Sequence, residues 1–238
     1  MEGDILTVQN LTVAFGDLTI LKNLSFEVKR GEVVAIIGPN GSGKTVFLKT
    51  LLGLIPYRGI ITWDPNVKLG YVPQKIDADR HLPINLHNLF EAKAHTLALP
   101  HKDIVEVSHV VGLTPVMLQT PIGHLSGGQF QKGLIAFALL GAPNVILFDE
   151  PTASLDELSE EHVYDLMHQL QDDRGITFIL VSHDLSVVYQ YASKVLCLNK
   201  EKICYGLPKE ALTPEVLSEL YAAPHKFFHH SQDHHHHA

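Results

Sequence analysis

The stretch "GEVVAIIGPNGSGKT", residues 31–45, decides how the rest of the sequence is interpreted. Its first half is a continuous apolar run, which predicts a buried strand. Its second half, Gly38 to Thr45, fits the pattern GxxxxGK[ST], whose glycines let the backbone turn its N–H groups inward around phosphate oxygens. The residues after Thr45 have helical spacing and stop before Pro56. A strand, a glycine loop and a helix in this order predict a phosphate site.

Within this loop each side chain has an expected task. Lys44 would reach the β- and γ-phosphates of a nucleotide, and Thr45 would place its hydroxyl on Mg²⁺. The other loop residues expected to contact the nucleotide are Gly38, Pro39, Asn40, Gly41, Ser42, Gly43 and Val46. A glycine-rich turn that binds no ligand is the alternative, and the strand and helix on either side argue against it.

Two apolar runs downstream of the loop end in polar residues. The run "VILFDEP" places Asp149 and Glu150 at the end of a predicted buried strand, where ligands collect in α/β sheets. We expect Asp149 to hold Mg²⁺ and Glu150 to polarise the water that attacks the γ-phosphate. Another run, "FILVSHD", ends in His183, which could hydrogen-bond the γ-phosphate. An acidic pair facing solvent and a structural histidine are the alternatives.

The rest of the chain alternates between strand and helix patterns. Residues 5–16 and 19–28 predict strands before the glycine loop. From Lys75 to about Gly123 the density of β-branched residues drops, and apolar spacings of three and four predict a helical insert. Strands and helices then alternate through residues 144–206, which predicts an α/β fold with a mostly parallel sheet flanked by helices.

Composition excludes several classes of protein. The 238 residues, 45 % hydrophobic and 18 % charged, fit a globular chain of one sizeable or two small domains. A net charge of -8 without a basic cluster makes nucleic acid an unexpected partner. The longest apolar stretches are too short to cross a bilayer, and the start lacks the features of a signal peptide, so we expect a cytosolic chain. Cys197 and Cys204 lie seven apart without a CxxC pattern, which favours reduced buried thiols over a disulfide or zinc site.

The motif "LSGGQ", residues 125–129, begins another predicted helix. The hydroxyl of Ser126 and the amides of Gly127 and Gly128 would form a second anion cradle. Since the two cradles lie in different subdomains, each would serve a different end of a dimer.

The order of these motifs resembles the ATP-binding cassette (ABC) ATPases from about Asp4 to Gly206. It comprises the phosphate loop, Gln74 in "YVPQ", "LSGGQ", "FDEP", "SLD" at residues 154–156 and "SHD". The resemblance implies an ABC-type P-loop NTPase with a mixed central sheet, an N-terminal antiparallel β subdomain and an α-helical insert at about 75–140. Residues 1–224 would form the single ATPase domain.

The resemblance also implies a head-to-tail dimer with two ATP molecules, each with Mg²⁺, between the subunits. The phosphate loop of one copy would face Ser126, Gly127, Gly128 and Gln129 of the other. Phe15 would stack on adenine, and Asp156 would cross the dimer interface. Gln74 would link Mg²⁺ and the attacking water to a membrane partner, and His183 would clamp the γ-phosphate.

Some positions depart from the pattern of the family. Phe15 stands where tyrosine is common and retains a stacking face. Val46 stands where a second hydroxyl residue is usual, and Lys132 and Phe137 stand where the family carries arginine. These departures leave the catalytic groups in place.

The lack of a predicted membrane span indicates the separate ATPase subunit of a multi-chain importer, peripheral on the inner face of the cell membrane. Its expected partners are integral membrane permease subunits and a solute-binding protein. Residues 79–90, "DRHLPINLHNLF", imperfectly resemble the "FPxTVxDVV" stretch of ATPases in zinc and manganese importers, so we expect a divalent metal cargo.

The chain ends in "HKFFHHSQDHHHHA", residues 225–238, an expected disordered tail in which six of the last ten residues are histidine. Histidine is a common metal ligand, so the tail could sense or buffer metal. The interruption at residues 231–233 favours a natural tail over an engineered tag.

Other functions stay open. The same motor would serve an exporter or an importer of another solute. A non-transport ABC ATPase would normally carry two cassettes or a long coiled-coil insertion in one chain. A metal-binding module would explain the tail but leave the nucleotide motifs unexplained.

Overall fold

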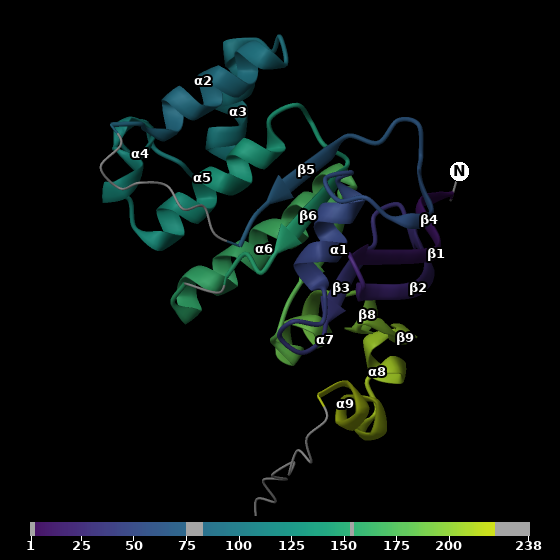
Figure 1. The fold of residues 1–238 in the computed structure, drawn as a ribbon. Coiled ribbons are helices and arrows are strands. Elements are labelled where there is room, and N and C mark those ends of the chain that lie inside the picture. The colour runs from purple at the N-terminus through teal and green to yellow at the C-terminus, as the bar shows by residue number, and fades with distance from the viewer. Residues whose placement is uncertain (1–2, 75–82, 153–154, 222–238) are drawn as a thin grey trace, which may run out of the picture.

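The computed structural model describes residues 3–74, 83–152 and 155–221. Figure 1 shows a small antiparallel sheet, a larger central sheet and a separate group of helices. The small sheet has the order β2-β1-β4, formed by β1 (Asp4–Phe15), β2 (Leu18–Lys29) and β4 (Arg58–Trp63). The expected N-terminal antiparallel β subdomain is therefore confirmed.

The central sheet has the order β5-β6-β7-β3-β8-β9. Its strands are β3 (Val33–Ile37), β5 (Leu69–Val72), β6 (Val145–Asp149), β7 (Thr177–Val181), β8 (Lys194–Asn199) and β9 (Glu201–Gly206). All neighbours pair in parallel except β8 and β9, which pair antiparallel. The sheet is mostly parallel, as the sequence patterns predict, and mixed, as the family resemblance implies.

Hydrophobic cores lie on both faces of this sheet because alternate residues of each strand point to opposite sides. In β3, Val34 and Ile36 join the core shared with the small sheet and α1 (Lys44–Leu51), whereas Val33, Ala35 and Ile37 join the core shared with the other helices. Burial on both faces explains why β3 reads as a continuous apolar run.

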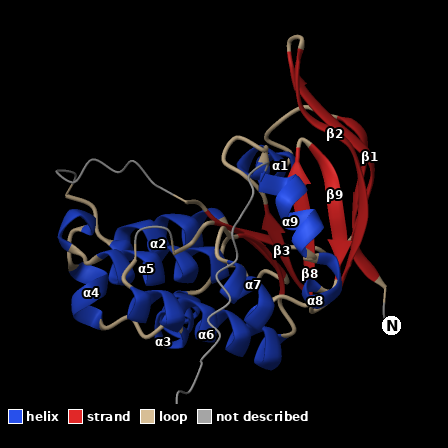
Figure 2. Cartoon of the chain, turned by 90° about the horizontal axis from the view of Figure 1, so that it is seen from below, coloured by secondary structure: helices blue, strands red, loops and turns tan. Residues whose placement is uncertain are grey.

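The helices beyond α1 fall into two groups (Figure 2). The helical insert contains α2 (Leu86–Thr96), α3 (His101–Val110), α4 (Pro115–Gln119), a 3₁₀ turn (Ile122–His124) and α5 (Gly127–Leu139). The helices closer to the central sheet are α6 (Glu157–Arg174), α7 (Leu185–Tyr191), α8 (Pro208–Ala211) and α9 (Pro214–Tyr221). Within the described ranges, no helix has both the length and the apolarity to cross a membrane.

A close contact joins α2 to α5 within the helical insert. A Cβ added to Gly133 of α5 would lie 2.5 Å from Cδ2 of Leu86, the first residue of α2. Since real Cβ atoms do not approach carbon atoms so closely, a side chain at position 133 would force Leu86 to move, and glycine lets the Leu86 side chain pack directly against α5.

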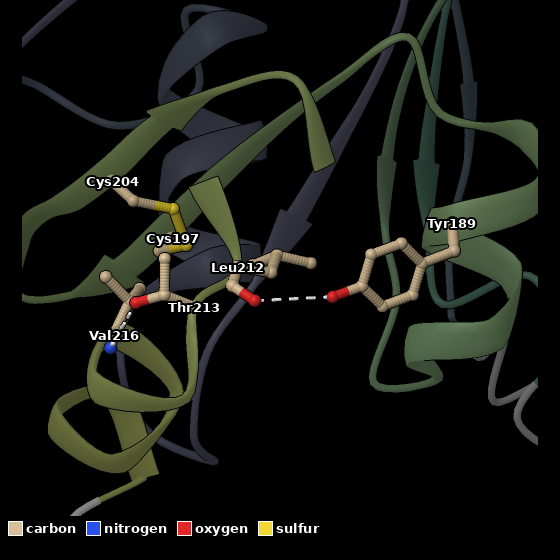
Figure 3. Close-up of a disulfide and its surroundings, with 6 residues drawn as sticks. All are labelled: Tyr189, Cys197, Cys204, Leu212, Thr213 and Val216. Atoms are coloured by element: carbon tan, nitrogen blue, oxygen red, sulfur yellow. Dashed lines mark hydrogen bonds between the residues drawn. A yellow bond between two sulfur atoms is a disulfide. The ribbon is translucent and has the colours of Figure 1, made fainter. Parts of the chain in front are cut away.

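The expectation of two reduced cysteines is wrong. Cys197 and Cys204 form a disulfide, shown in Figure 3. They lie on β8 and β9, whose antiparallel pairing places them directly opposite one another with a Cα–Cα distance of 4.8 Å. That distance suits a disulfide. A spacing of seven residues does not reveal the hairpin that creates this pairing.

The predicted tail, residues 225–238, lies outside the described residues.

Candidate functional site

Two glycines of the phosphate loop lie where a side chain would collide. Gly38 has φ 156°, and a Cβ there would lie 2.0 Å from the carbonyl oxygen of Leu198 on β8. Gly43, the N-cap of α1, has φ 100°, and a Cβ there would lie 2.6 Å from Cδ2 of Leu21. The loop is also held by Lys200, whose backbone N–H donates to the carbonyl of Ser42 at 3.3 Å. Tertiary contacts therefore fix the path of the loop.

Lys44 lies over this loop rather than extending into solvent. Its side chain is buried, and Nζ donates to the carbonyl oxygens of Gly38 at 2.9 Å and Pro39 at 3.1 Å. Burial lowers the pKa of Lys44, while the nearby carboxylates of Glu150 and Asp149 act in the opposite direction. The positive charge of Lys44 thus already lies beside the loop, where the negatively charged phosphates of a nucleotide would bind.

Ser42 gives this loop a further polar group. Its side chain is buried, and Oγ has no hydrogen-bond partner among the residues that the structure describes. A buried hydroxyl without a partner costs free energy, so a ligand with acceptor oxygens would stabilise it. This observation fits the phosphate groups of a nucleotide.

Asp149 is the last residue of β6 and lies at the start of α1. Thr45 Oγ1 donates to Asp149 Oδ1 at 3.1 Å, and the hydroxyl of Tyr71 on β5 donates to Oδ2 at 3.4 Å. Burial raises the pKa of Asp149, and the charge of Glu150 raises it further against the effect of the Thr45 hydrogen bond. Burial, with the Asp149 charge, also raises the pKa of Tyr71 to about 12. The hydroxyl and carboxylate oxygens of Thr45 and Asp149 are hard donors of the kind that Mg²⁺ prefers.

Gln74 and Glu150 meet beside this pair. Gln74 Nε2 donates to Glu150 Oε2 at 2.6 Å, although the two residues are 76 positions apart. Glu150 has φ 48° and is followed by Pro151. A left-handed backbone is uncommon for a residue other than glycine and costs roughly 1 kcal/mol or more, which is typical of functional sites. The strained backbone thus lies at the residue whose carboxylate meets Gln74.

His183 emerges from the neighbouring strand. Asp149 on β6 is opposite Val181 on β7, so the residues beyond both strands leave the same edge of the sheet. His183 is exposed there, and Asp184 caps α7 by accepting a 2.7 Å hydrogen bond from the backbone N–H of Ser186. Hydrogen bonds from Ser186 lower the pKa of Asp184.

The "LSGGQ" motif lies in a different part of the molecule. Ser126 is the N-cap of α5; its Oγ accepts from the backbone N–H of Gln129 at 3.2 Å, and its own N–H donates to Gln129 Oε1 at 3.0 Å. Both residues belong to the helical insert, apart from α1 in Figure 1, and Ser126, Gly127 and Gly128 are not buried. The structure therefore does not bring this motif to the phosphate loop of its own chain.

Asp156 lies near that motif. It caps α6 by accepting hydrogen bonds from the backbone N–H of Ser159 at 3.0 Å and from Ser159 Oγ at 2.9 Å. These hydrogen bonds lower the pKa of Asp156. A Cβ added to Gly128 would lie 3.0 Å from the same Ser159 Oγ, so the starts of α5 and α6 are neighbours. Asp156 and the motif thus share one region of the surface.

The remaining candidates lie around the loop. Phe15 ends β1 and is 52 % exposed, which leaves its ring accessible. Asn40 and Gly41 are exposed at the loop tip, while Val46 is half-buried in α1. Sequence reasoning did not find Tyr71, because its approach to Asp149 depends on the pairing of β5 with β6. A tyrosine three residues before Gln74 carries no signal of that contact.

Candidate metal-binding side chains were also sought outside this site, in the part of the chain that the structure describes. Over residues 3–74, 83–152 and 155–221, no group of three or more His, Cys, Asp and Glu is placed to hold a metal ion.

The family model for ABC transporters matches residues 21–153, a stretch that contains the phosphate loop, Asp149 and Glu150. The chain belongs to the ABC transporter family. This confirms the resemblance predicted from the order of the motifs, and it identifies the chain as an ABC-type ATPase coupled to transport.

Two relatives match the ABC chain over most of its length. The zinc import ATP-binding protein ZnuC of Rickettsia conorii is 36 % identical over 237 residues, which cover 99 % of this chain and all of that protein. A probable metal transport system ATP-binding protein of Thermotoga maritima is 37 % identical over 220 residues, or 91 % of this chain and 90 % of that protein.

A solved structure shares the ABC fold. It is described as an inward-facing conformation of a metal-chelate type ABC transporter, with a TM-score of 0.82 and 27 % identity. The match covers 92 % of this chain and 89 % of that one. The predicted α/β class and ABC-type architecture are therefore confirmed.

Proposed function

We propose that this chain is the ATP-binding and ATP-hydrolysing subunit of an importer for divalent metal ions, zinc or manganese. The placement of Glu150 beside the Thr45–Asp149 pair carries the hydrolytic part of the proposal. The names of the two relatives support the metal cargo. We take residues 1–224 as one ATPase domain that includes the helical insert.

The phosphate loop would hold the nucleotide. Backbone N–H groups of the loop, the start of α1 and the Ser42 hydroxyl would donate to phosphate oxygens. When ATP binds, Lys44 would replace its hydrogen bonds to the Gly38 and Pro39 carbonyls with hydrogen bonds to the β- and γ-phosphates. Its ammonium would therefore have acceptors both with and without the nucleotide. Phe15 would stack on the adenine ring through its exposed face.

Thr45 and Asp149 would hold Mg²⁺ with their oxygens, and Gln74 would contribute from the neighbouring segment. When bound, Mg²⁺ neutralises charge that develops on the phosphates. The Thr45–Asp149 hydrogen bond keeps the two oxygens 3.1 Å apart before the ion arrives.

Glu150 would act as the group that polarises the attacking water. Its carboxylate can accept a hydrogen bond from water, while Gln74 holds one of its oxygens in place. His183, from the adjacent strand end, would hydrogen-bond the γ-phosphate. Each group lies at the carboxyl edge of the central sheet, where open α/β sheets bind ligands.

A second copy would complete the site. Ser126, Gly127, Gly128 and Gln129 lie away from the phosphate loop of their own chain but face outward at the start of α5, which suits contact with the nucleotide of another copy. Asp156, close to that surface through Ser159, would cross the interface. Permease subunits in the membrane and a solute-binding protein would complete the importer, with this chain on the cytoplasmic face.

The site is tested by Glu150→Gln, which keeps the shape of the side chain and removes its negative charge. We expect turnover to fall to background while ATP still binds, so the dimer accumulates in gel filtration with ATP and Mg²⁺. Glu219→Gln, an exposed change on α9, is the matched control and should retain turnover. A monomer at all ATP concentrations would contradict the proposed dimer.

The cargo is tested in cells that depend on this chain. Cellular zinc, manganese and iron are measured under metal limitation with the native chain and with Glu150→Gln. A selective fall in zinc or manganese in the variant supports metal import and names the ion. Unchanged metal contents would favour another solute or an exporter.

The tail has a separate test. Removing residues 225–238 should leave ATP hydrolysis nearly intact because the tail follows every nucleotide motif. If the tail buffers metal, as we propose, the shortened chain should retain less zinc in equilibrium dialysis than the full chain.

A further inference from the structure

The carboxylate of Asp149 accepts a hydrogen bond on each of its two oxygens. Thr45, in the first turn of α1, donates to Oδ1 at 3.1 Å, and Tyr71 of β5 donates to Oδ2 at 3.4 Å. Asp149 is 2 % exposed, so water has little access to either oxygen. The orientation of this buried carboxylate therefore depends on two hydroxyls that come from different elements.

The pairing of β5 with β6 places Tyr71 on the same face of the sheet as Asp149. Figure 1 shows the two strands side by side. Tyr71 is opposite Leu147 in this parallel pair, and Asp149 follows Leu147 by two positions, so all three point to one face. The Tyr71 ring packs against the core that α1 and the small sheet share on this face. The core thus holds the ring while the hydroxyl reaches the end of β6.

Two hydrogen bonds fix a carboxylate in a way that one does not. The Cβ–Cγ torsion of aspartate has a broad minimum, so a donor to Oδ1 alone would leave the plane of the carboxylate free to turn. The donor on Oδ2 fixes that plane. The Thr45 hydroxyl uses its proton in the bond to Asp149, which leaves its lone pairs available to a metal ion. The oxygens of Thr45 and Asp149 are therefore oriented together as long as Tyr71 holds the second carboxylate oxygen.

We propose that Tyr71 is a positioning residue for Mg²⁺, whose hydroxyl fixes the plane of the Asp149 carboxylate and so orients the oxygens that bind the ion. The inference rests on the roles proposed above for Thr45 and Asp149 as metal ligands. Mg²⁺ requires nearly octahedral geometry at short distances, so it tolerates a turned carboxylate poorly. Hydrogen bonds that orient metal ligands are typically worth about 10- to 100-fold in metal affinity.

The first experiment measures metal binding without turnover. Mn²⁺, which prefers the same oxygen donors as Mg²⁺, is titrated onto the full chain with a non-hydrolysable ATP analogue and followed by electron paramagnetic resonance. Only binding that requires the analogue is counted, which excludes metal held by the tail. In Tyr71→Phe, which keeps the packed ring, the Mn²⁺ concentration for half-saturation should rise about tenfold. Half-saturation at the native concentration would overturn the proposal.

Tyr189→Phe is the matched control. The Tyr189 hydroxyl donates to the carbonyl oxygen of Leu212 at 3.4 Å, the same length as the bond from Tyr71 to Asp149, but it joins α7 to the end of α8. This variant should bind Mn²⁺ as the native chain does. Both variants should bind the analogue in EDTA within about twofold of the native affinity, because the phosphate loop is unchanged. A large loss in EDTA in Tyr71→Phe would show a defect of the loop itself and contradict the proposal.

A double variant tests whether Tyr71 acts through Asp149. Asp149→Asn should weaken Mn²⁺ binding more than Tyr71→Phe does, because it removes the negative charge of the proposed ligand. Adding Tyr71→Phe to Asp149→Asn should then cost less than about twofold, since the carboxylate that the hydroxyl orients is already gone. Losses that multiply would show that Tyr71 acts elsewhere, which also overturns the proposal.

Asp149→Asn also separates this inference from the proposed function. If Asp149→Asn weakens Mn²⁺ binding but Tyr71→Phe does not, the metal site stands and the inference about Tyr71 fails. If Asp149→Asn binds Mn²⁺ as the native chain does, Asp149 is not a ligand. The proposed metal site then fails, and the inference fails with it.

Discussion

The phosphate loop and the start of α5 present similar groups, glycine amides and a hydroxyl, but they are held in opposite ways. The loop is enclosed: Lys44 and Ser42 are buried, and Gly38 lies against the carbonyl of Leu198. Ser126, by contrast, is at the surface and is fixed by a capping box with Gln129, three residues away.

This difference teaches which half of the site depends on the fold. The loop receives contacts from β8 and β6, distant in sequence, so its shape depends on the whole central sheet. The start of α5 keeps its shape through local hydrogen bonds and can present its amides outward. One chain would therefore supply an enclosed half and an exposed half of the proposed site.

The largest effect should come from breaking the enclosed half. Lys44→Met removes the buried ammonium, and we expect ATP affinity to fall on the order of 10²-fold or more because a charge-assisted contact to phosphate is lost. Titration with a fluorescent ATP analogue measures this. Lys102→Met, an exposed change on α3, should bind as the native chain does. Equal affinity in the two variants would show that Lys44 does not contact the nucleotide.

The disulfide between β8 and β9 offers the next test, because β8 contacts the phosphate loop. Closing a loop of this size with the Cys197–Cys204 disulfide should contribute about 2 kcal/mol to the free energy of unfolding. Reduction with dithiothreitol should therefore lower the melting temperature by about 5 °C. Cys204→Ser should melt at one temperature with or without reductant. A native chain insensitive to reductant would indicate that the bond is absent in solution.

The exposed half is tested by Ser126→Ala. Loss of the N-cap should cost about 1 kcal/mol of stability, and hydrolysis should fall although the ATP affinity of the dilute monomer stays native. Thr114→Ala removes the N-cap of α4 and should cost similar stability without a loss of hydrolysis. If both variants lose hydrolysis equally, Ser126 matters only as a cap.

The smallest effect concerns the turn after His183. Hydrogen bonds from Ser186 hold the pKa of Asp184 below its ordinary value, so the ionised form stabilises the folded chain. That contribution is fully present above the unfolded pKa of about 3.9 and is lost as pH falls through the folded pKa. Asp184→Asn should lower stability at pH 7 by about 0.5 kcal/mol, and the difference should shrink as pH falls below the unfolded pKa of about 3.9. Denaturant unfolding over a series of pH values measures this, with Glu219→Gln expected to show no difference at pH 7.

Much of the fold follows from local patterns. The apolar run before Gly38 and the helical spacing after Thr45 predict β3 and α1 because glycine spacing and side-chain periodicity are properties of short segments. The strands that end at Asp149 and Val181 are also predictable, since both are continuous apolar runs. These segments identify the candidate groups of the site.

Contacts between strands could not be predicted in the same way. The Gln74–Glu150 hydrogen bond, the approach of Tyr71 to Asp149 and the Thr152–Tyr164 hydrogen bond all depend on which strands and helices become neighbours. The wrong expectation for Cys197 has the same origin. Strand pairing and register depend on packing in the whole core. A single sequence indicates them only where a recognisable motif marks the strand ends.

The contact between Gly133 and Leu86 limits which residues position 133 accepts. The Leu86 side chain occupies the space where a Cβ of residue 133 would lie, so a larger residue there would force that side chain to move. Leu86 is the first residue of α2 and Ser126 immediately precedes α5, so this glycine lies in the packing that joins the first helix of the insert to the helix that begins beside the exposed serine.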